Sequence, residues 1–448
     1  MYRSFVFHRY NYGMLVLLAT LLSCRSGSVN LFKPASPHQA YRQKLINAGL
    51  DRSAMGSSWI SNADESLKKS LNISIPYKET GYFAAERIPV SVYRFTASRG
   101  QKLKINLVKK PDNNFVIYTD VWEIPENGRQ KLIAWADTTG QPLELDIKSS
   151  GIYLVRLQPE LLSSGQYTLE ISSGPSLGFP VKYSGKASVQ SYFGDGRDAG
   201  SRKHEGIDIF AAFRTPVVAA AAGTVQRVNE NNLGGKVVWL RPIGKDYTLY
   251  YAHLDEQLAI EGQQVLPGDT LGLMGNTGNA HSTPPHLHFG IYTSDGAIDP
   301  YPFVNTAIRP LPAITASINY LNDTVRSIGK TSVFAGPESN SSESAIVKAG
   351  TIIQVTAVNS SWYTVQLPNG YTGFIPGKQI SSLASPLRKL KITSPAQNVY
   401  DRPDSLAAIK TALSMGKMVD ILGHFENYLL IADGDKQTGW IKELNLSR

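Results

Sequence analysis

The sequence predicts a mainly β protein that combines a β-sandwich, an antiparallel-β domain and two small β-barrels. Short segments with apolar residues at every second position alternate with turns rich in Gly, Ser and Pro, which is typical of strands. The C-terminal part of the chain also repeats its own pattern. Charged residues make up 18% and aromatic residues 10% of the 448 residues, which fits folded modules better than disorder. The length is sufficient for several domains.

The first residues have the pattern of an export signal. Basic residues precede an apolar run over 14–22 that is too short to span a membrane as a helix. The run ends at Leu21-Leu22-Ser23-Cys24, which resembles the lipobox of bacterial lipoprotein signal peptides. This resemblance implies a signal peptide over 1–23 and a lipid on the thiol of Cys24. Cys24 is the single cysteine of the chain, so an anchoring role is more economical than an ordinary signal peptide that happens to end near a cysteine.

The net charge gives little information about partners. The formal charge is +9 for the whole chain and +7 once Arg3 and Arg9 leave with the signal. A moderately basic exported protein can be attracted to anionic wall polymers, but no long basic run is present, and plain solubility explains the charge. Because the chain is expected to be exported, we expect no nucleic acid as a partner.

Residues 24–74 are expected to form a linker with short helices that spaces the body of the protein from the membrane. One helix is expected to begin at Ser36-Pro37 and to stop at Gly49, and a second is expected over 62–71. Neither helix carries evident chemistry.

Residues 75–176 are expected to form a jelly-roll-like β-sandwich. Segments 90–95, 103–107, 152–157 and 167–171 alternate at period two between turn clusters. The region loosely resembles the pre-peptidase jelly rolls of secreted proteases. It contains no catalytic grouping, so a structural or substrate-orienting role is expected.

The most informative segment runs from Pro284 to Tyr292. On a strand, Leu287, Phe289 and Ile291 point to one face, whereas His286, His288 and Gly290 point to the other. Two neighbouring imidazoles on one surface suit a divalent cation, which requires neutral nitrogen ligands. A His-x-His pair by itself is more often two polar surface residues.

Two further segments supply what such a cation still lacks. The same pleat would place His204, Gly206 and Asp208 together, and His253 ends another strand-like run. A catalytic zinc site takes three protein ligands from His and carboxylate side chains and leaves one position for water. His204, Asp208 and one of the paired histidines satisfy this requirement, with two histidines left over. Glu205 does not fit a His-Glu-x-x-His helix and is expected to face away from the ligands as a surface or orienting residue.

With these residues placed, the segment resembles the lysostaphin/LytM-type zinc endopeptidases over about 180–305. Ser191-Tyr192-Phe193-Gly194 and Gly275-Asn276-Thr277-Gly278 strengthen the likeness. The resemblance implies a zinc metallopeptidase domain over 177–310 with one zinc ion. It makes His204, Asp208 and His288 the ligands, and His253 and His286 the catalytic pair. No position of this set is substituted, and the implied substrate is peptidoglycan.

The C-terminal part is an internal duplication. Val333-Phe334 matches Val399-Tyr400, and Gly373-Phe374-Ile375 matches Gly439-Trp440-Ile441, both offset by 66 (399 − 333). This offset is too long for a solenoid repeat and predicts two tandem barrels over 325–382 and 390–448. They resemble bacterial SH3-like domains, which implies binding of cell-wall peptide or glycan. The aromatic residues of this region are either part of that binding surface or simply core, namely Trp362, Tyr363, Tyr428 and Trp440.

We therefore expect a cell-envelope zinc metalloendopeptidase that is anchored in a bacterial membrane through Cys24 and hydrolyses peptide bonds of peptidoglycan. One alternative is a non-catalytic wall-binding lipoprotein that activates other hydrolases. The other is a zinc peptidase that acts on proteins. The sequence identifies neither the substrate-binding residues nor protein partners.

Overall fold

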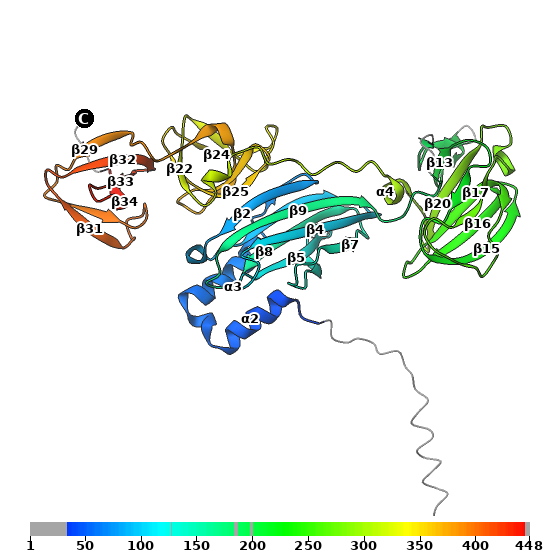
Figure 1. Ribbon diagram of the computed structural model, residues 1–448, viewed down its shortest axis with the longest axis horizontal. Coiled ribbons are helices and arrows are strands. Elements are labelled where there is room, and N and C mark those ends of the chain that lie inside the picture. The colour runs from blue at the N-terminus through cyan, green and yellow to red at the C-terminus, as the bar shows by residue number, and fades with distance from the viewer. Residues whose placement is uncertain (1–33, 127, 183–186, 198–199, 444–448) are drawn as a thin grey trace, which may run out of the picture.

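The computed structural model describes residues 34–126, 128–182, 187–197 and 200–443 (Figure 1). The expected signal peptide over 1–23 and the expected lipid attachment site Cys24 lie outside the described residues. Within those four ranges, no helix combines the length and the apolarity needed to cross a membrane. A β-sandwich occupies the middle of the molecule, with a separate β-sheet unit at one end and two small barrels toward the other.

The first helix forms as the sequence predicts. α2 (Pro37–Asn47) begins after Ser36, whose hydroxyl accepts a hydrogen bond from the Gln39 backbone, and the Gln39 side chain accepts one in return from the Ser36 backbone. The second helix was expected over 62–71, which is wrong. α3 (Ala54–Ser66) starts earlier, because the hydroxyl of Ser53 caps the backbone N–H of Gly56.

Both helices pack on the sandwich. Trp59 of α3 is 1% exposed, and its indole N–H donates to the carbonyl of Pro159 at 2.8 Å. His38 of α2 stacks on Trp59 with ring centroids 4.7 Å apart and bonds Gln158 at 2.7 Å. Ordered helices therefore cover one face of the sandwich within the segment where a linker was expected.

Two layers form the sandwich, and their strands pair antiparallel except for β1, which pairs parallel with β3. Apolar side chains from the two inner faces pack together, among them Phe95, Val155, Leu103 and Ile171. One layer is a 5-stranded sheet in the order β1 (Leu71–Asn72), β3 (Ser91–Ala97), β8 (Gly151–Pro159), β5 (Ile117–Ile124), β6 (Lys131–Trp135). The other contains β2 (Tyr77–Phe83), β9 (Gly165–Pro175), β4 (Gln101–Lys110) and β7 (Leu143–Asp146).

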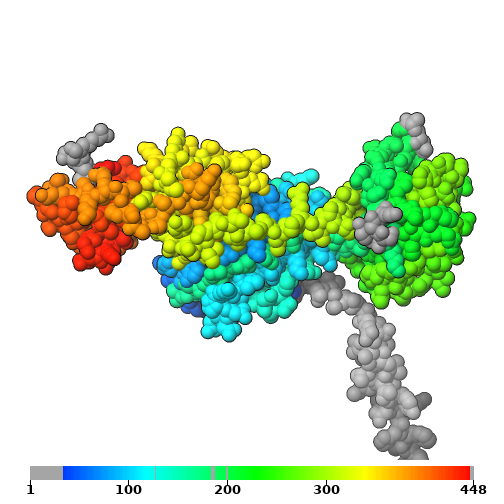
Figure 2. Space-filling model, turned by 45° about the horizontal axis from the view of Figure 1, so that its top comes forward, coloured from blue at the N-terminus to red at the C-terminus, as the bar shows by residue number. Residues whose placement is uncertain are grey.

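The second layer continues directly into the first barrel. β2 pairs with β25 (Ile352–Asn359), so that Gly81 lies opposite Ala357 and Thr80 opposite Val358. The barrel comprises β22 (Thr324–Ser327), β23 (Thr331–Phe334), β24 (Glu343–Val347), β25, β26 (Trp362–Gln366), β27 (Thr372–Pro376) and β28 (Ile380–Ser382). Segment 305–323 reaches this barrel across the molecular surface (Figure 2), where Thr315 donates its backbone N–H to the carbonyl of Ser360 at 2.8 Å.

The second barrel repeats the first. Its strands are β29 (Arg388–Lys391), β30 (Ala396–Tyr400), β31 (Ile409–Ser414), β32 (Met418–Phe425), β33 (Tyr428–Ala432) and β34 (Thr438–Lys442). β32 bridges the first barrel through His424, whose backbone N–H donates to the carbonyl of Gly350 at 2.9 Å. Gly423 and His424 correspond, at the offset of 66 (423 − 357), to the Ala357 and Val358 that pair with β2. The first barrel therefore contacts the sandwich, and the second barrel contacts the first, through corresponding positions of β25 and β32.

Three of the aromatic residues considered for wall binding are core residues. Tyr363, Tyr428 and Trp440 are 2%, 7% and 7% exposed, and they belong to one hydrophobic cluster that spans both barrels. Trp362 is half-buried and packs against the core of the sandwich. The core alternative holds for these side chains.

The separate unit is built on a 10-stranded sheet with its own apolar core. The central order is β10 (Ser188–Ser191), β13 (Ile207–Phe210), β20 (His286–Thr293), β17 (Thr248–Gln257), β16 (Gly235–Pro242), β15 (Gly223–Asn231), β18 (Gln264–Val265). Off this path, β19 (Thr270–Met274) pairs with β17, β14 (Pro216–Val218) pairs with β19, and β21 (Gly296–Ile298) pairs with β20. β11 (Gly196–Arg197) and β12 (Arg202–Lys203) form a separate 2-stranded sheet. The short helix α4 (Tyr301–Val304) closes the unit. The domain limits given above remain a prediction.

Candidate metal centre

The strand register brings two of the expected ligands face to face. β13 and β20 are antiparallel, and Asp208 lies directly opposite His288. The alternation predicted for β20 is confirmed, because Leu287, Phe289 and Ile291 are all 0% exposed on the core side. The side chains of Asp208 and His288 therefore project from the opposite face of the sheet.

His204 reaches the same place from outside the strand. β13 begins only at Ile207, so residues 204–206 belong to no strand, and Gly206 lies in a bend. A Cβ added at Gly206 would lie 2.8 Å from Nε2 of His288, so only glycine lets the two segments approach this closely. His204 is 3% exposed.

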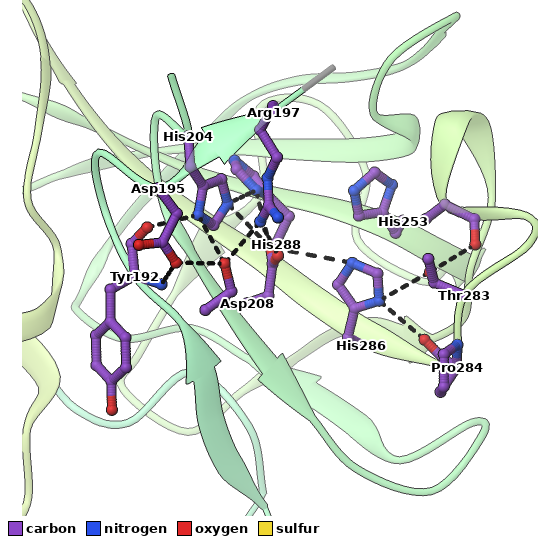
Figure 3. Close-up of polar contacts among 12 residues, drawn as sticks. Tyr192, Asp195, Arg197, His204, Asp208, His253, Thr283, Pro284, His286 and His288 are labelled. Atoms are coloured by element: carbon purple, nitrogen blue, oxygen red, sulfur yellow. Dashed lines mark hydrogen bonds and ion pairs between the residues drawn. The ribbon is translucent and has the colours of Figure 1, made fainter. Parts of the chain in front are cut away.

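Two imidazoles and one carboxylate converge. Nε2 of His204 lies 2.9 Å from Nδ1 of His288, and each of these nitrogens lies 3.1 Å from Oδ1 of Asp208. Figure 3 shows the three side chains turned toward one another. The three ligand atoms are close enough together to hold one metal ion. Two nitrogen donors and one carboxylate oxygen suit a catalytic zinc site that keeps a position open for water, so the residues present fit this metal.

Outer contacts orient these side chains. Nδ1–H of His204 donates to the carbonyl of Tyr192 at 2.9 Å, which turns Nε2 toward Asp208. Arg197 donates from Nη2 to Oδ2 of Asp208 at 2.5 Å and to the hydroxyl of Ser191 at 2.7 Å. Nothing in the sequence pattern pointed to Arg197 in this role.

The surroundings of Asp208 and His288 favour the protonation states in which these side chains can bind a metal ion. Burial alone would raise the pKa of Asp208, but hydrogen bonds from His204 and His288 hold that pKa well below its ordinary value. Burial lowers the pKa of His288. A charged carboxylate beside a neutral imidazole is the state in which both groups bind a cation.

The two remaining histidines lie beside this group. His253 follows the β17 residue Ala252, which lies opposite His288, and its positive φ of 63° departs from the regular pleat. Its Nδ1 bonds the carbonyl of Thr277 at 2.8 Å, and Nδ1 of His286 bonds the carbonyl of Pro284 at 2.9 Å. In a neutral ring of either histidine, Nε2 therefore carries the lone pair. Burial, followed by the charges of the neighbouring imidazoles, lowers the pKa of His253 to about 4.

All five residues line one groove of about 520 Å³. Its walls also include Trp239, Tyr250, Tyr292 and Glu205. Glu205 is exposed, as expected for a surface residue, and it also lines this groove, outside strand β13. Sequence reasoning missed the aromatic wall, since its members come from three different strands and meet only through the pairing of those strands.

Comparison with known proteins agrees with this geometry. Residues 202–300 match peptidase family M23, and residues 330–382 match the bacterial SH3 domain. Residues 202–300 are an M23 peptidase domain. The resemblance to lysostaphin/LytM-type endopeptidases is thereby confirmed, as is the SH3-like character of the first barrel.

Relatives of the M23 domain share this segment and little else of the chain. The L-Ala--D-Glu endopeptidase of Bacillus subtilis is 38% identical over 136 residues, which cover 28% of this chain and 41% of that protein. The peptidoglycan DD-endopeptidase ShyC of Vibrio cholerae is 36% identical over 88 residues, covering 20% of each chain. The chain thus spans less than half the length of either relative. The catalytic domain of lysostaphin from Staphylococcus simulans is 30% identical over 26% of this chain and 90% of that domain, with a TM-score of 0.24.

Proposed function

We propose that the chain is a zinc metalloendopeptidase of the cell envelope that hydrolyses peptide bonds of peptidoglycan. The main support for this proposal is that His204, Asp208 and His288 converge on one point of the M23 domain, beside two further histidines. Support for the substrate comes from ShyC, which is named a peptidoglycan endopeptidase, and from the bacterial SH3 domain in the same chain. The lipobox-like segment before Cys24 supports a membrane anchor.

In this proposal Nε2 of His204, Oδ1 of Asp208 and Nδ1 of His288 hold the zinc ion. Bound zinc supplies a Lewis acid that polarises a carbonyl and makes water acidic near neutral pH. Tyr192 and Arg197 keep two of the ligands oriented through the contacts described above. The groove confines a substrate peptide next to this group.

His253 and His286 carry the proton transfers. The Nδ1–H of each histidine donates to a backbone carbonyl, so Nε2 of each ring can accept a proton and release it again. Nε2 of His286 lies 4.0 Å from Oδ1 of Asp208, and the two rings are 5.0 Å apart. One of them, with its Nε2 lone pair, takes the proton of the attacking water. The other, once its Nε2 carries a proton, donates it to the oxyanion and then gives it to the leaving amine.

Digestion of purified sacculi tests the proposal. Zinc-loaded protein should release peptide fragments that mass spectrometry identifies, and elemental analysis should find one zinc per chain. His288→Ala should lose both zinc and fragment release while its circular dichroism spectrum is retained. His281→Ala, a histidine of the exposed loop beside the groove, is the matched control and should stay active.

The same experiment separates the alternatives. A wall-binding activator would release no fragments by itself, although it would bind sacculi. A peptidase for proteins would leave sacculi intact and cleave unfolded polypeptides. Full fragment release by zinc-free His288→Ala would refute the enzyme assignment.

A further inference from the structure

One wall of the groove is a cluster of three aromatic rings. Ring centroids are 4.3 Å apart for Trp239 and Tyr250, 5.6 Å for Trp239 and Tyr292, and 5.8 Å for Tyr250 and Tyr292. The residues lie on β16, β17 and β20, where Trp239 is opposite Tyr250 and Tyr250 is opposite Gly290. The cluster adjoins the metal centre, because the ring of Tyr250 is 5.9 Å from that of His288.

A carboxylate borders this aromatic cluster. The hydroxyl of Tyr292 donates to Oε2 of Glu205 at 3.3 Å, and Glu205 is exposed. Gly290 makes the arrangement possible. A Cβ at that position would lie 2.8 Å from Cε2 of Tyr292, so the missing side chain lets the tyrosine ring lie against the strand.

The charges of the groove assign Glu205 a distinct role. Among the described residues that line the groove, the carboxylates are Asp208 and Glu205. Asp208 is enclosed by two imidazoles and by the guanidinium of Arg197. Glu205 is therefore the acid that a cationic substrate group can reach. Arg197 and Arg202 line the same groove, so an anionic group would meet a guanidinium and not Glu205.

We propose that Glu205 and the rings of Trp239, Tyr250 and Tyr292 form a subsite for a primary ammonium group of the substrate peptide. Aromatic faces attract ammonium groups through their quadrupoles, and a carboxylate adds a charge-assisted hydrogen bond. The ammonium group would sit next to the bond being hydrolysed, since the cluster touches His288. This inference deepens the proposed peptidoglycan hydrolysis and rests on it.

The experiment compares two forms of one substrate. Sacculi with free amino groups are divided, and one half is acetylated so that its amines lose their charge. Zinc-loaded wild-type protein should digest untreated sacculi about tenfold faster than acetylated sacculi. Glu205→Gln should remove this preference, and Glu205→Asp should restore part of it. Glu261→Gln, an exposed acid outside the groove, should behave as wild type.

A purely structural role of Glu205 predicts a different result. Loss of the Tyr292 contact alone would slow digestion of both sacculi equally in Glu205→Gln and would leave the preference intact. Tyr292→Phe removes the same hydrogen bond but keeps the ring, so it should retain the preference. Zinc content should be unchanged in these variants.

The outcomes also distinguish the two proposals. If wild-type protein digests neither form of sacculi, the proposed function fails. If it digests both forms at equal rates, or if Glu205→Gln keeps the wild-type preference, only the ammonium subsite is refuted.

Discussion

Arg197 and Asp208 form an ion pair in which the guanidinium holds the carboxylate oxygen that the histidines do not contact. Nη2 of Arg197 donates to Oδ2 at 2.5 Å, whereas Oδ1 lies 3.1 Å from the ring nitrogens of His204 and His288. The same Nη2 also donates to Ser191. The carboxylate is thereby fixed in the orientation that offers a single oxygen to the proposed zinc site (Figure 3).

Replacing Arg197 should therefore weaken metal binding. We expect Arg197→Ala to lower zinc affinity by about 10- to 100-fold, because contacts behind the ligands typically contribute that much. The zinc affinity of Arg197→Lys should lie between that of Arg197→Ala and that of the wild type, since lysine keeps the positive charge but lacks the planar guanidinium group. Competition with a chromophoric chelator measures the affinity. Arg241→Ala, an exposed residue of β16, is the control, and an unchanged affinity in Arg197→Ala would contradict the assigned role.

The two histidines outside the ligand set should affect the rate and not the metal. His253→Ala and His286→Ala are expected to keep one zinc per chain and to lose about 10²- to 10⁴-fold in the rate of sacculus digestion, as for loss of a general acid or base. His204→Ala should lose the zinc as well. Elemental analysis combined with single-turnover rates separates these classes. Loss of zinc in both His253→Ala and His286→Ala would show that their proposed role is wrong.

Acid should weaken the packing of α2 on the sandwich. Burial, followed by the charge of Arg156, lowers the pKa of His38 to about 3. Nδ1 of His38 faces Nη2 of Arg156 at 3.0 Å and therefore accepts, which requires a neutral ring.

In the unfolded chain the His38 ring takes up a proton near pH 6.5, whereas in the folded chain it stays neutral down to about pH 3. The contribution of His38 to the free energy of unfolding is therefore fully present above pH 6.5 and decreases as the pH falls toward 3. The contribution lost between pH 7.5 and pH 5 is about 2 kcal/mol. Urea denaturation of wild type and His38→Gln at both pH values measures it, and the variant should lose less stability on acidification. An equal loss in both proteins would disprove this role of His38.

The contact between the two barrels depends on a glycine. A Cβ at Gly423 would lie 2.4 Å from Cδ1 of Ile352 and 2.7 Å from the carbonyl of Gly350. We expect Gly423→Val to cost about 1–3 kcal/mol by overpacking this contact. Faster limited proteolysis between the barrels and a lower denaturation midpoint would report it. Gly434→Val, where nothing lies within 4 Å of the added Cβ, should resemble wild type.

Patterns confined to one segment were predictable from the sequence. The alternation over β20 required only neighbouring residues, and the cap of α2 required only Ser36 and Gln39. The offset of 66 residues holds for β25 and β32 from end to end. The chemistry of His and Asp side chains then indicated which residues to group. Their roles remain a proposal.

Features that join distant segments were not predictable. The continuous sheet through β2 and β25 depends on backbone pairing between strands whose sequences carry no mark of their partner. β13 pairs with β20 from Ile207 onward, so Glu205 lies outside the strand, and its place in the lining of the groove depends on this pairing between distant segments.

By itself the sequence determined which faces of the strands are apolar and which side chains can bind a cation, since both are properties of residue type and spacing. Only the tertiary structure decided that Arg197 meets Asp208 and that three aromatic rings gather beside Glu205. Such contacts depend on strand register and on the close approach that Gly206 and Gly290 allow, and both arise from the packing of the whole domain.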